Sequence, residues 1–597
     1  MSSSSLLPPV SRLIIIFFLS CSRSFIGMMR RRKLSTSLLV LFLVTVLAAL
    51  FFLHLSSNSV TGKEVQLFPD NLMVGSKDRD SLINHAISIR EEVKELGHRN
   101  RRVSSIQDKI DSVTVLLPSW EVLVVVVVST ENKLASRSDD NFYCLFPNNA
   151  TSLAKFYGVL PFSSAMAFKC VLPRSNRRRP PFYQPVLTRS SGSESPALPS
   201  RELTRWSFLV YDSVSTEDDV VLFVKGVNKR QGINRSPEEF RCVFGNDLKT
   251  TVKTPITSSV QEVFRCSHPN LKLLGGERIK VTLEISGELN GQIPSVAYYT
   301  PRRKVAPPNP KKLLCACTMV YNSAKFLREW VMYHSEIGVE KFILYDNGST
   351  DDLQKIVDEL NREGYSVEKI LWIWPKTQEA GFSHGAVYGK DSCVWMMYFD
   401  VDEFVFSPSW LNSSNPSKNM LNSLLPKNPD LNRPLIGQIS IKCNDFGPSG
   451  RKTHPLEGVT QGYTCCRKVE QRHKSVVLLE AVDRSLLNVV HHFGLNQSFY
   501  RTVELGLKAA VMNHYKYQAW PEFKNKFRQR VSAYVVDWTK AVNPTSQDRT
   551  PGLGFEAIEP AGWAQRFCEV RDERLKKLTQ RWFGSNTPNG YKLAWER

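Results

Sequence analysis

The chain has 597 residues, of which 42% are hydrophobic and 10% aromatic, and its formal net charge is +21. This length suffices for two or more domains with hydrophobic cores, and the composition excludes a largely disordered protein. The excess of basic residues favours acidic or phosphorylated partners. Nucleic acid is not expected among them, because the basic clusters come without zinc-finger spacing or an RNA-binding aromatic motif.

The first strong signal in chain order is an apolar run near the N-terminus. Residues 38–55 read LLVLFLVTVLAALFFLHL, just long enough to cross a bilayer as a helix, and a basic cluster at 30–33 precedes them. The positive-inside rule predicts a single-pass signal anchor at 34–55, with a cytosolic tail at 1–33 and a luminal chain after it. A cleaved signal peptide is the alternative. Translation from the methionines before the basic cluster would leave 1–27 untranslated.

Two segments of different composition follow the predicted anchor. Residues 56–112 are polar and charged with helical periodicity, which favours a stem that holds the later domains off the membrane. From 113 to 299, short runs rich in Val, Phe and Tyr alternate with turn-rich segments. This spacing predicts an accessory domain with an antiparallel, β-sandwich-like fold.

A luminal location agrees with the cysteines and glycosylation sequons of the chain. Four cysteines fall within the predicted β-sandwich, and an even set in one region predicts two disulfides, whose pairing the sequence leaves open. Metal binding is the alternative, but no two of the four have close ligand spacing. The cysteines are Cys144, Cys170, Cys242 and Cys266, and the sequons begin at Asn149, Asn234, Asn412 and Asn496.

A proline-rich segment at 300–312 predicts a linker, and an α/β domain is expected at 313–597. Its first strands lack a polar face, which indicates a mostly parallel sheet covered on both sides. We predict strands at 313–322, 341–347, 367–374 and 395–406, and helices at 323–338 and 351–364.

Polar side chains stand at the ends of three of these strands. Ligands of open α/β sheets collect at the carboxyl ends of the strands, so these side chains predict a ligand-binding edge. The residues are Tyr321, Asn322, Asp346, Asn347, Asp400 and Asp402.

The segment WMMYFDVDEFVF at 395–406 places Asp400, Asp402 and Glu403 inside an otherwise apolar run. Buried negative charge needs a positive partner. An Asp-X-Asp pair can bind Mg²⁺ or Mn²⁺ and leave coordination positions for the oxygens of a diphosphate. We therefore predict a divalent cation that carries a nucleotide diphosphate, with Glu403 orienting nearby groups. A solvated turn and a Ca²⁺-binding adhesion module are the alternatives.

Several motifs in fixed order resemble glycosyltransferase family 92, whose plant branch includes β-1,4-galactan synthases. The resemblance covers roughly residues 310 to 545. It implies a GT-A fold, which is Rossmann-like, a nucleotide-sugar donor, a divalent cation that is usually Mn²⁺, and inversion at the anomeric carbon. It also implies that the β-rich domain is an accessory, carbohydrate-binding module. The motifs are YNSAKFLREWVMYHSEIGVEKFILYDNGSTDD at 321–352, Gln378, His384, the Asp-X-Asp segment, and NHYKYQAWPEFKNKF at 513–527.

The resemblance also implies the ligands of the metal ion. Asp400 and Asp402 would bind the cation and, through it, the diphosphate. His514 in the NHYK motif would be the third metal ligand, with His491 and His492 as alternatives.

On the donor side, the resemblance implies contacts to the nucleotide sugar. Asp346 and Asn347 would face the nucleoside, with Tyr321 and Asn322 at the neighbouring strand end, and Lys516 would lie near the diphosphate. The sequon at Asn347 is predicted to stay unmodified, because a glycan there would block the nucleotide pocket.

An inverting transfer needs a base that takes the proton of the acceptor hydroxyl. Candidates are Asp445 in CNDFGPSG, Glu457 in HPLEGVTQGY, and Glu403 itself. For Asp445 the alternative is a turn aspartate that caps local backbone. Ser323 and Gln461 stand where family members have Glu, so acceptor specificity does not carry over.

These predictions together describe a single-pass type II protein of the Golgi membrane with a luminal, metal-dependent inverting glycosyltransferase domain. It would move a sugar, with galactose favoured by the resemblance alone, from a UDP-sugar to a cell-wall polysaccharide or another glycan. The alternative is a non-catalytic glycan-binding protein with an inactive GT-A domain. The sequence leaves the donor sugar, the acceptor and the oligomeric state open, including a homodimer.

Overall fold

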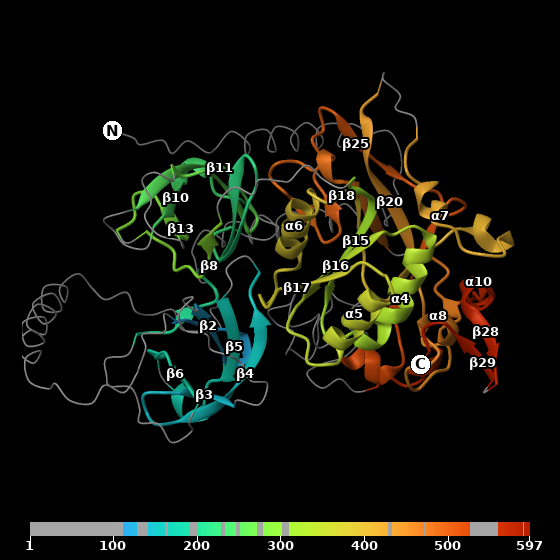
Figure 1. Ribbon diagram of the computed structural model, residues 1–597, viewed down its shortest axis with the longest axis horizontal. Coiled ribbons are helices and arrows are strands. Elements are labelled where there is room, and N and C mark those ends of the chain that lie inside the picture. The colour runs from blue at the N-terminus through green and yellow to red at the C-terminus, as the bar shows by residue number, and fades with distance from the viewer. Residues whose placement is uncertain are drawn as a thin grey trace, which may run out of the picture. The chain divides into compact units, whose positions relative to one another are not determined.

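The computed structural model covers most of the chain after residue 111 (Figure 1), and every described residue belongs to one compact unit, Gln107–Arg597. The predicted tail and anchor lie outside the described residues, as does the stem apart from Ser112. Within the described ranges, no helix has the length and hydropathy needed to cross a membrane. The described residues are 112–127, 141–161, 165–178, 180–189, 201–228, 233–245, 251–270, 279–289, 291–300, 310–427, 433–470, 472–525, 559–588 and 590–596.

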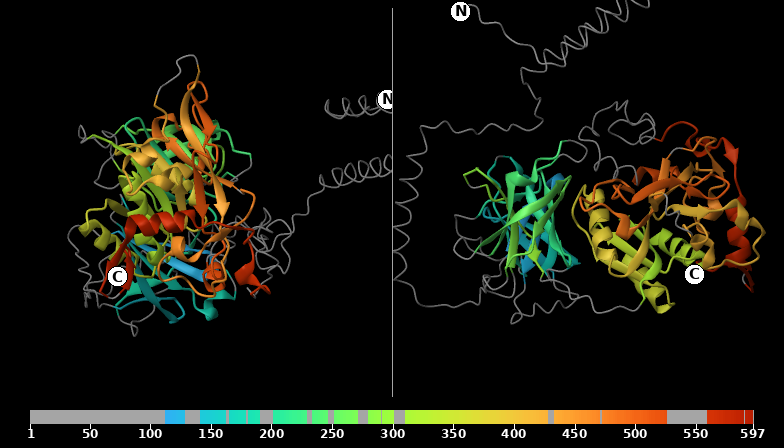
Figure 2. Two further views of the ribbon diagram at one scale, coloured as in Figure 1. Left: turned by 90° about the vertical axis from the view of Figure 1, so that its right-hand side faces the viewer. Right: turned by 90° about the horizontal axis from the view of Figure 1, so that it is seen from above.

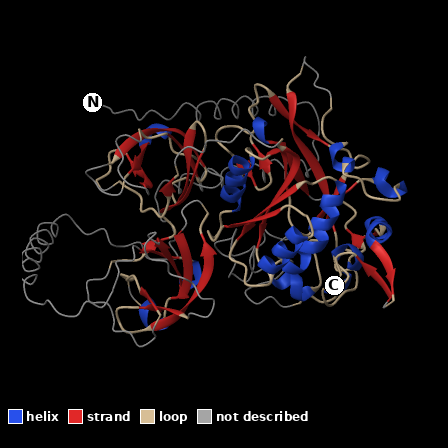
Figure 3. Cartoon of the chain, viewed as in Figure 1, coloured by secondary structure: helices blue, strands red, loops and turns tan. Residues whose placement is uncertain are grey.

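The described residues before 300 form strands and a few short 3₁₀ helices (Figure 3). The first sheet is built from β1 (Ser112–Leu116), β2 (Glu121–Val127), β3 (Phe142–Leu145), β4 (Thr151–Val159), β5 (Ala165–Val171), β6 (Val186–Thr188) and β7 (Thr204–Arg205). The second is built from β8 (Leu209–Ser215), β9 (Asp219–Lys225), β10 (Phe240–Phe244), β11 (Val252–Val260), β12 (Val263–Ser267), β13 (Ile279–Ile285) and β14 (Tyr298–Tyr299). Their orders are β6-β3-β4-β5-β2-β1-β7 and β14-β13-β10-β11-β12-β9-β8.

Both faces of β2 are buried, which explains its unbroken apolar run. Val122, Val124 and Val126 pack in a core that the first sheet forms by itself, whereas Leu123 and Val125 pack in a cluster shared with the α/β part of the chain. Strand β9 alternates in the same way between the core of its own sheet and the shared cluster. Each sheet thus has a separate core, which differs from the predicted sandwich, where two sheets enclose one core between them.

Two disulfides join neighbouring parts of these sheets. They pair Cys144 with Cys170 and Cys242 with Cys266. The prediction of two disulfides among these four cysteines is confirmed, and the structure assigns the pairing that the sequence left open.

The α/β part contains one large sheet with the path β17-β16-β15-β18-β22-β20-β26-β19, to which β25 adds beside β20. Its strands are β15 (Lys312–Val320), β16 (Lys341–Asp346), β17 (Val367–Leu371), β18 (Cys393–Tyr398), β19 (Glu403–Phe406), β20 (Leu435–Asp445), β22 (Arg472–Leu478), β25 (Tyr500–Glu504) and β26 (Val511–His514). Short two-stranded pairs are β21 (Cys465–Cys466) with β27 (Val570–Arg571), β23 (Asn488–Val489) with β24 (His492–Phe493), and β28 (Gly584–Thr587) with β29 (Gly590–Leu593).

The strands from β17 to β18 are parallel neighbours, as predicted, and the remainder of the sheet is mixed. Strand β22 is antiparallel to both β18 and β20, β26 is parallel to β20, and β19 is antiparallel to β26. Parallel pairing in the first half places the carboxyl ends of β16, β15 and β18 at one edge of the sheet.

Helices cover both faces of this sheet (Figures 1 and 2). In β16, Phe342 and Leu344 pack with α4 and α5, whereas Ile343 and Tyr345 pack with α6 on the other face. The predicted helices at 323–338 and 351–364 correspond to α4 and α5. The helices are α4 (Ala324–Ile337), α5 (Leu353–Arg362), α6 (Gln378–Gly389), α7 (Asn419–Asn422), α8 (Val459–Gly462) and α10 (Arg574–Phe583).

Helix α6 was not predicted, because it contains three glycines and glycine is a poor helix former. Gly381, Gly385 and Gly389 are spaced four residues apart and face the sheet. A Cβ atom at these positions would lie 2.6 Å from Met319 Cε, 2.9 Å from Cys317 Sγ and 2.6 Å from a methionine Cε in β18, respectively. The glycines therefore let α6 approach the sheet closely.

The strand predicted at 395–406 is two strands. Strand β18 ends at Tyr398 and β19 begins at Glu403, four positions further along the sheet path. Four strand spacings of about 4.8 Å would span about 19 Å in a flat sheet, slightly more than the roughly 18 Å that five fully extended residues can reach. The connection turns instead, since Glu403 N donates a hydrogen bond to Asp400 O at 3.0 Å. The second half of the sheet must therefore curl, and the Asp-X-Asp segment is the turn.

The two β sheets and the α/β part contact each other through an aromatic interface. Trp206 and Trp374 stack with ring centroids 5.8 Å apart and planes 3° from parallel. Trp374 Nε1 donates a hydrogen bond to Asp212 at 3.1 Å. The side-chain amide of Gln261 donates to the backbone oxygen of Asn488 at 2.8 Å.

Candidate functional site

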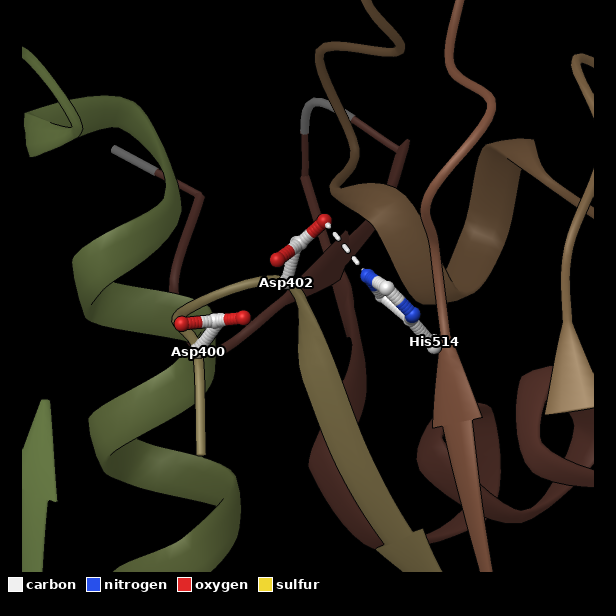
Figure 4. A group of neighbouring side chains, drawn as sticks. All are labelled: Asp400, Asp402 and His514. Atoms are coloured by element: carbon white, nitrogen blue, oxygen red, sulfur yellow. Dashed lines mark ion pairs between the residues drawn. The ribbon is translucent and has the colours of Figure 1, made fainter. Parts of the chain in front are cut away.

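The predicted carboxylates lie where β18, β19, β26 and β20 meet. Glu403 at the start of β19 pairs with His514 at the end of β26, and His514 pairs in turn with Asp445 at the end of β20. Directly paired residues point to the same face of a sheet, so these three side chains form a row. Asp400 and Asp402 lie on the turn that precedes β19 (Figure 4). The structure thus brings together five residues that span more than a hundred positions of sequence.

Asp400, Asp402 and His514 form a candidate metal site. Each offers one ligand atom, and these atoms lie within 4.8 Å of one another. His514 Nε2 lies 3.7 Å from Asp402 Oδ2 (Figure 4). This buried nitrogen makes no hydrogen bond to any residue that the structure describes. Two carboxylates and an imidazole are ligands that Mn²⁺ and Mg²⁺ sites accept, so the residues present fit a divalent cation.

Asp445 holds His514 from the opposite side of the imidazole ring. Its Oδ1 lies 3.1 Å from His514 Nδ1, and its Oδ2 accepts a hydrogen bond from Lys516 Nζ at 2.9 Å. Burial raises the pKa of Asp445, but the hydrogen bond from His514 and the charge of Lys516 prevail and hold this pKa well below its usual range. An ionised Asp445 fixes the imidazole tautomer whose free Nε2 faces the two aspartates, as carboxylates do for metal-ligating histidines in known metal sites.

The positive partner of the carboxylates is Lys474, which sequence reasoning missed. Its Nζ lies 3.0 Å from Asp400 Oδ2 and 2.9 Å from Glu403 Oε1. The side chain is buried; burial alone would lower the pKa of Lys474, but Asp400 and Glu403 raise it. His491 Nε2 lies 2.6 Å from the same ammonium group and 3.8 Å from Asp400.

The sequence carried one weak signal for Lys474. It is the first buried residue of β22 and directly precedes the apolar run SVVLL. A lysine in that position normally lies at a solvated strand end. Only the pairing of β22 with β18 identifies it as a neighbour of Asp400.

Glu403 fixes the turn that carries the two aspartates. Its Oε2 accepts a hydrogen bond from Asp400 N at 2.7 Å, and the side chain is fully buried. Burial raises the pKa of Glu403, while Lys474 and His514 oppose this rise. These contacts agree with the predicted orienting role of Glu403.

The second group of predicted residues lies at the ends of β15 and β16, next to β18 in the sheet. Asp346 accepts hydrogen bonds from Ser349 N at 2.8 Å and from Lys369 Nζ at 3.2 Å. Asn347 donates its side-chain amide to Trp372 O at 2.7 Å. Tyr321 is 39% exposed. These contacts tie the loop after β16 to β17 and leave Tyr321 open to solvent.

Asn322, which follows β15, has a structural role because it binds the loop after β16. Its backbone is left-handed with φ of 47°, and its Oδ1 accepts a hydrogen bond from Thr350 N at 2.7 Å. Asparagine tolerates this conformation better than most residues.

His492 was one of the predicted alternatives to His514 as the third metal ligand. It contacts His473 at the surface and is not part of the candidate metal site.

Comparison with known proteins identifies the family. The sequence model of glycosyltransferase family 92 matches residues 311–549. A family 92 protein of Arabidopsis thaliana is 42% identical over 409 residues, which cover 67% of this chain and 70% of the relative. Another, from Ricinus communis, is 38% identical over 502 residues, 81% of this chain and 84% of the relative.

An α/β protein with these relatives is a glycosyltransferase. More narrowly, the chain belongs to glycosyltransferase family 92, as the resemblance predicted. Among solved structures, a mannosyltransferase from Pyrobaculum calidifontis in complex with GDP-Man and Mn²⁺ aligns over 40% of this chain and 68% of that one, at 13% identity. The TM-score of this alignment is 0.23.

Proposed function

We propose that this glycosyltransferase moves a sugar from a UDP-sugar to a polysaccharide or glycan acceptor, with a divalent cation bound at Asp400, Asp402 and His514. Galactose is the favoured sugar, Mn²⁺ the favoured cation, and inversion the favoured stereochemistry, all from the family resemblance stated above.

One observation carries the proposal more than any other. His514 Nε2 is buried, lacks a hydrogen bond within the described chain, and lies 3.7 Å from Asp402. A buried nitrogen acceptor without a partner is unfavourable unless a ligand completes it. A cation at this point would meet that need and would neutralise the charge of a departing diphosphate.

The surrounding residues hold the side chains of the candidate metal site in position. Asp445, paired with Lys516, holds the imidazole of His514 in place. Glu403 holds the turn through the backbone of Asp400. Both carboxylates are buried and have their oxygens engaged, so we assign them positioning roles; that either acts as the catalytic base stays a prediction.

The nucleoside of the donor would lie at the ends of β15 and β16. There Tyr321 is exposed, Asp346 at the end of β16 accepts a hydrogen bond from Lys369 of β17, and Asn347 donates one to Trp372 directly after β17. This edge is continuous with the end of β18, since the strands are parallel neighbours. A donor that lies along the edge would thus present its diphosphate near Asp400.

We also propose a luminal, Golgi-membrane location with single-pass type II topology. The disulfides among the described residues support an oxidising compartment. They join Cys144 to Cys170, Cys242 to Cys266, Cys315 to Cys393 and Cys465 to Cys568.

The direct test is release of UDP from a panel of UDP-sugars by the purified protein. We expect release with Mn²⁺ and glycan acceptor present, and none after the metal is removed with EDTA. Absence of release from every UDP-sugar, with glycan binding retained, would favour the non-catalytic alternative. Activity unchanged by EDTA would contradict the metal site.

Two variants and one control distinguish loss of a metal ligand from loss of the carboxylate that orients His514. Asp402→Ala should abolish activity, whereas Asp358→Ala, on the exposed face of α5, should leave it unchanged. Asp445→Asn should weaken Mn²⁺ binding about 10- to 100-fold, because His514 loses its orienting carboxylate. Release of UDP measures the activities, and titration with Mn²⁺ followed by electron paramagnetic resonance measures binding of the cation.

A further inference from the structure

Tyr157 in β4 of the first β sheet lies beside the loop that follows β16. Strand β4 contains a β-bulge: Phe156 pairs with Phe168 and Gly158 pairs with Ala167, so Tyr157 is the extra residue between them. Bulges redirect side chains and are frequent next to functional sites. Here the bulge lies against the α/β part of the chain.

The contact with the loop is close enough to require glycine. Gly348 has φ of +84°, and a Cβ atom there would lie 2.9 Å from Tyr157 Cε1 and 3.0 Å from its Cδ1. A Cβ atom at Gly158 would lie 3.3 Å from Leu371 Cδ2. The bulge therefore lies over the carboxyl ends of β16 and β17.

The surroundings of Tyr157 fix its ring. Lys169 Nζ lies 4.6 Å from the ring centroid and 3.4 Å from Glu121. The side chain is half-buried, and its hydroxyl makes no hydrogen bond to another described residue. Burial raises the pKa of Tyr157, as do the nearby Glu121, Tyr321 and Asp346. The contact with Gly348, two residues after Asp346, places the ring at the carboxyl end of β16.

We propose that Tyr157 contacts the nucleoside of the UDP-sugar, so that the first β sheet completes the donor site of the α/β domain. The inference rests on the proposed function, because it takes the donor to lie along the ends of β15 and β16. It assigns to this sheet a role at the donor, separate from any binding of the acceptor glycan.

A tyrosine suits this position chemically. Its ring offers an apolar surface to the base or the ribose, and its hydroxyl offers a donor and an acceptor for their polar groups. The ring is also preorganised by Lys169 and Gly348, which reduces the entropy lost when a ligand binds.

The first experiment uses the unmodified protein. A 5-azido analogue of UDP-glucose is photoactivated in the presence of Mn²⁺, and the labelled peptides are mapped by mass spectrometry. We expect label in the peptide that contains Tyr157, and loss of that label when excess UDP is added. Label confined to residues after 310 would contradict the inference.

The second experiment compares Tyr157→Ala and Tyr157→Phe with Phe156→Ala as the matched control. Phe156 precedes Tyr157 but packs on Phe168, with ring centroids 5.2 Å apart, in the first sheet. We expect Tyr157→Ala to weaken UDP binding about tenfold, in the range found for aromatic–base contacts. The KM for the donor should rise similarly, while kcat changes little and the control stays within twofold.

The outcomes separate this inference from the proposed function. If the wild type binds UDP and Tyr157→Ala binds it equally well, the inference fails and the proposed function stands. If the wild type binds no UDP, both fail. Tyr157→Phe guards against a misfolded alanine variant, because it keeps the ring. If Tyr157→Phe loses UDP binding at an unchanged melting temperature, the result supports contact through the hydroxyl. If Tyr157→Phe binds UDP as the wild type does and the photolabel is also found, the result supports contact through the ring.

Discussion

Three carboxylates within four residues would repel one another in a buried setting, and Lys474 compensates two of them. Its ammonium group contacts Asp400 and Glu403 at 3.0 and 2.9 Å. A buried ion pair of this kind adds little net stability by itself, but removal of one partner leaves an uncompensated charge. Lys474 therefore stabilises the folded arrangement of these carboxylates whether or not a cation is bound.

Lys474→Met should destabilise the metal-free protein by about 3–5 kcal/mol, the range for a broken buried pair. Addition of Mn²⁺ should recover part of this loss, since the cation restores positive charge at the site. Urea unfolding with and without Mn²⁺ measures both effects.

The matched control for this variant is Lys418→Met. Lys418 pairs with Glu336 at 3.0 Å, but its side chain is 58% exposed, and exposed pairs contribute about 0–1 kcal/mol. Equal destabilisation by the two variants would contradict the role assigned to Lys474.

For individual residues, the sequence predicted only those roles that follow from residues close together in the chain. Asp400 and Asp402 are two positions apart, and their chemistry is legible from that spacing alone. Lys474 and Tyr157 reach their sites through strand pairing and a β-bulge, which no local pattern encodes. His514 was identified only because its motif resembles that of a family.

Among the elements, the loop after β16 shows how backbone conformation permits close contact with β4. Gly348 and Gly364 both have positive φ, +84° and +94°, but only Gly348 contacts another part of the chain. Substitution of Gly364 therefore tests backbone strain alone, whereas substitution of Gly348 tests backbone strain together with steric contact.

Gly364→Ala should cost about 1–2 kcal/mol, the strain of a left-handed residue. Gly348→Ala should cost at least about 1 kcal/mol more, because the ring of Tyr157 must move as well. Urea unfolding of the two variants measures the difference, and equal values would show that the bulge does not press on this loop.

The elements that sequence reasoning missed have a common cause. Helix α6 depends on glycines that fit against Met319 and Cys317 across the sheet, and the break between β18 and β19 depends on the curl of strands that follow later in the chain. Both are tertiary effects that override local propensity. The helices α4 and α5, whose apolar periodicity is strong, were predicted to within three residues at either end.

For the whole molecule, Asp212 makes the interface between the second β sheet and the α/β part sensitive to pH. Burial raises the pKa of Asp212 to about 7, although hydrogen bonds from Trp374 and Ser213 oppose the rise. In the unfolded chain this carboxyl has a pKa near 3.9. Between these values the folded protein binds the proton more tightly, so its stability falls as pH rises from about 4 to about 7.

Asp212→Asn should remove this decline, because the amide cannot ionise and its oxygen can still accept from Trp374. We expect the variant to gain stability relative to the wild type, by up to a few kcal/mol, as pH rises from 4.5 to 7.5. Urea unfolding across this range measures the difference. Parallel curves for the two proteins would contradict the assignment.

The bond between Cys465 and Cys568 gives the protein a property that its linear sequence conceals. A protease that cuts once between 526 and 558 would produce two polypeptides that migrate together in a non-reducing gel and separate in a reducing one. Leu575 and Trp595 belong to the main core of the α/β part, so the shorter piece should also stay bound during gel filtration in reductant. The nicked enzyme would then be a two-chain protein made from one gene.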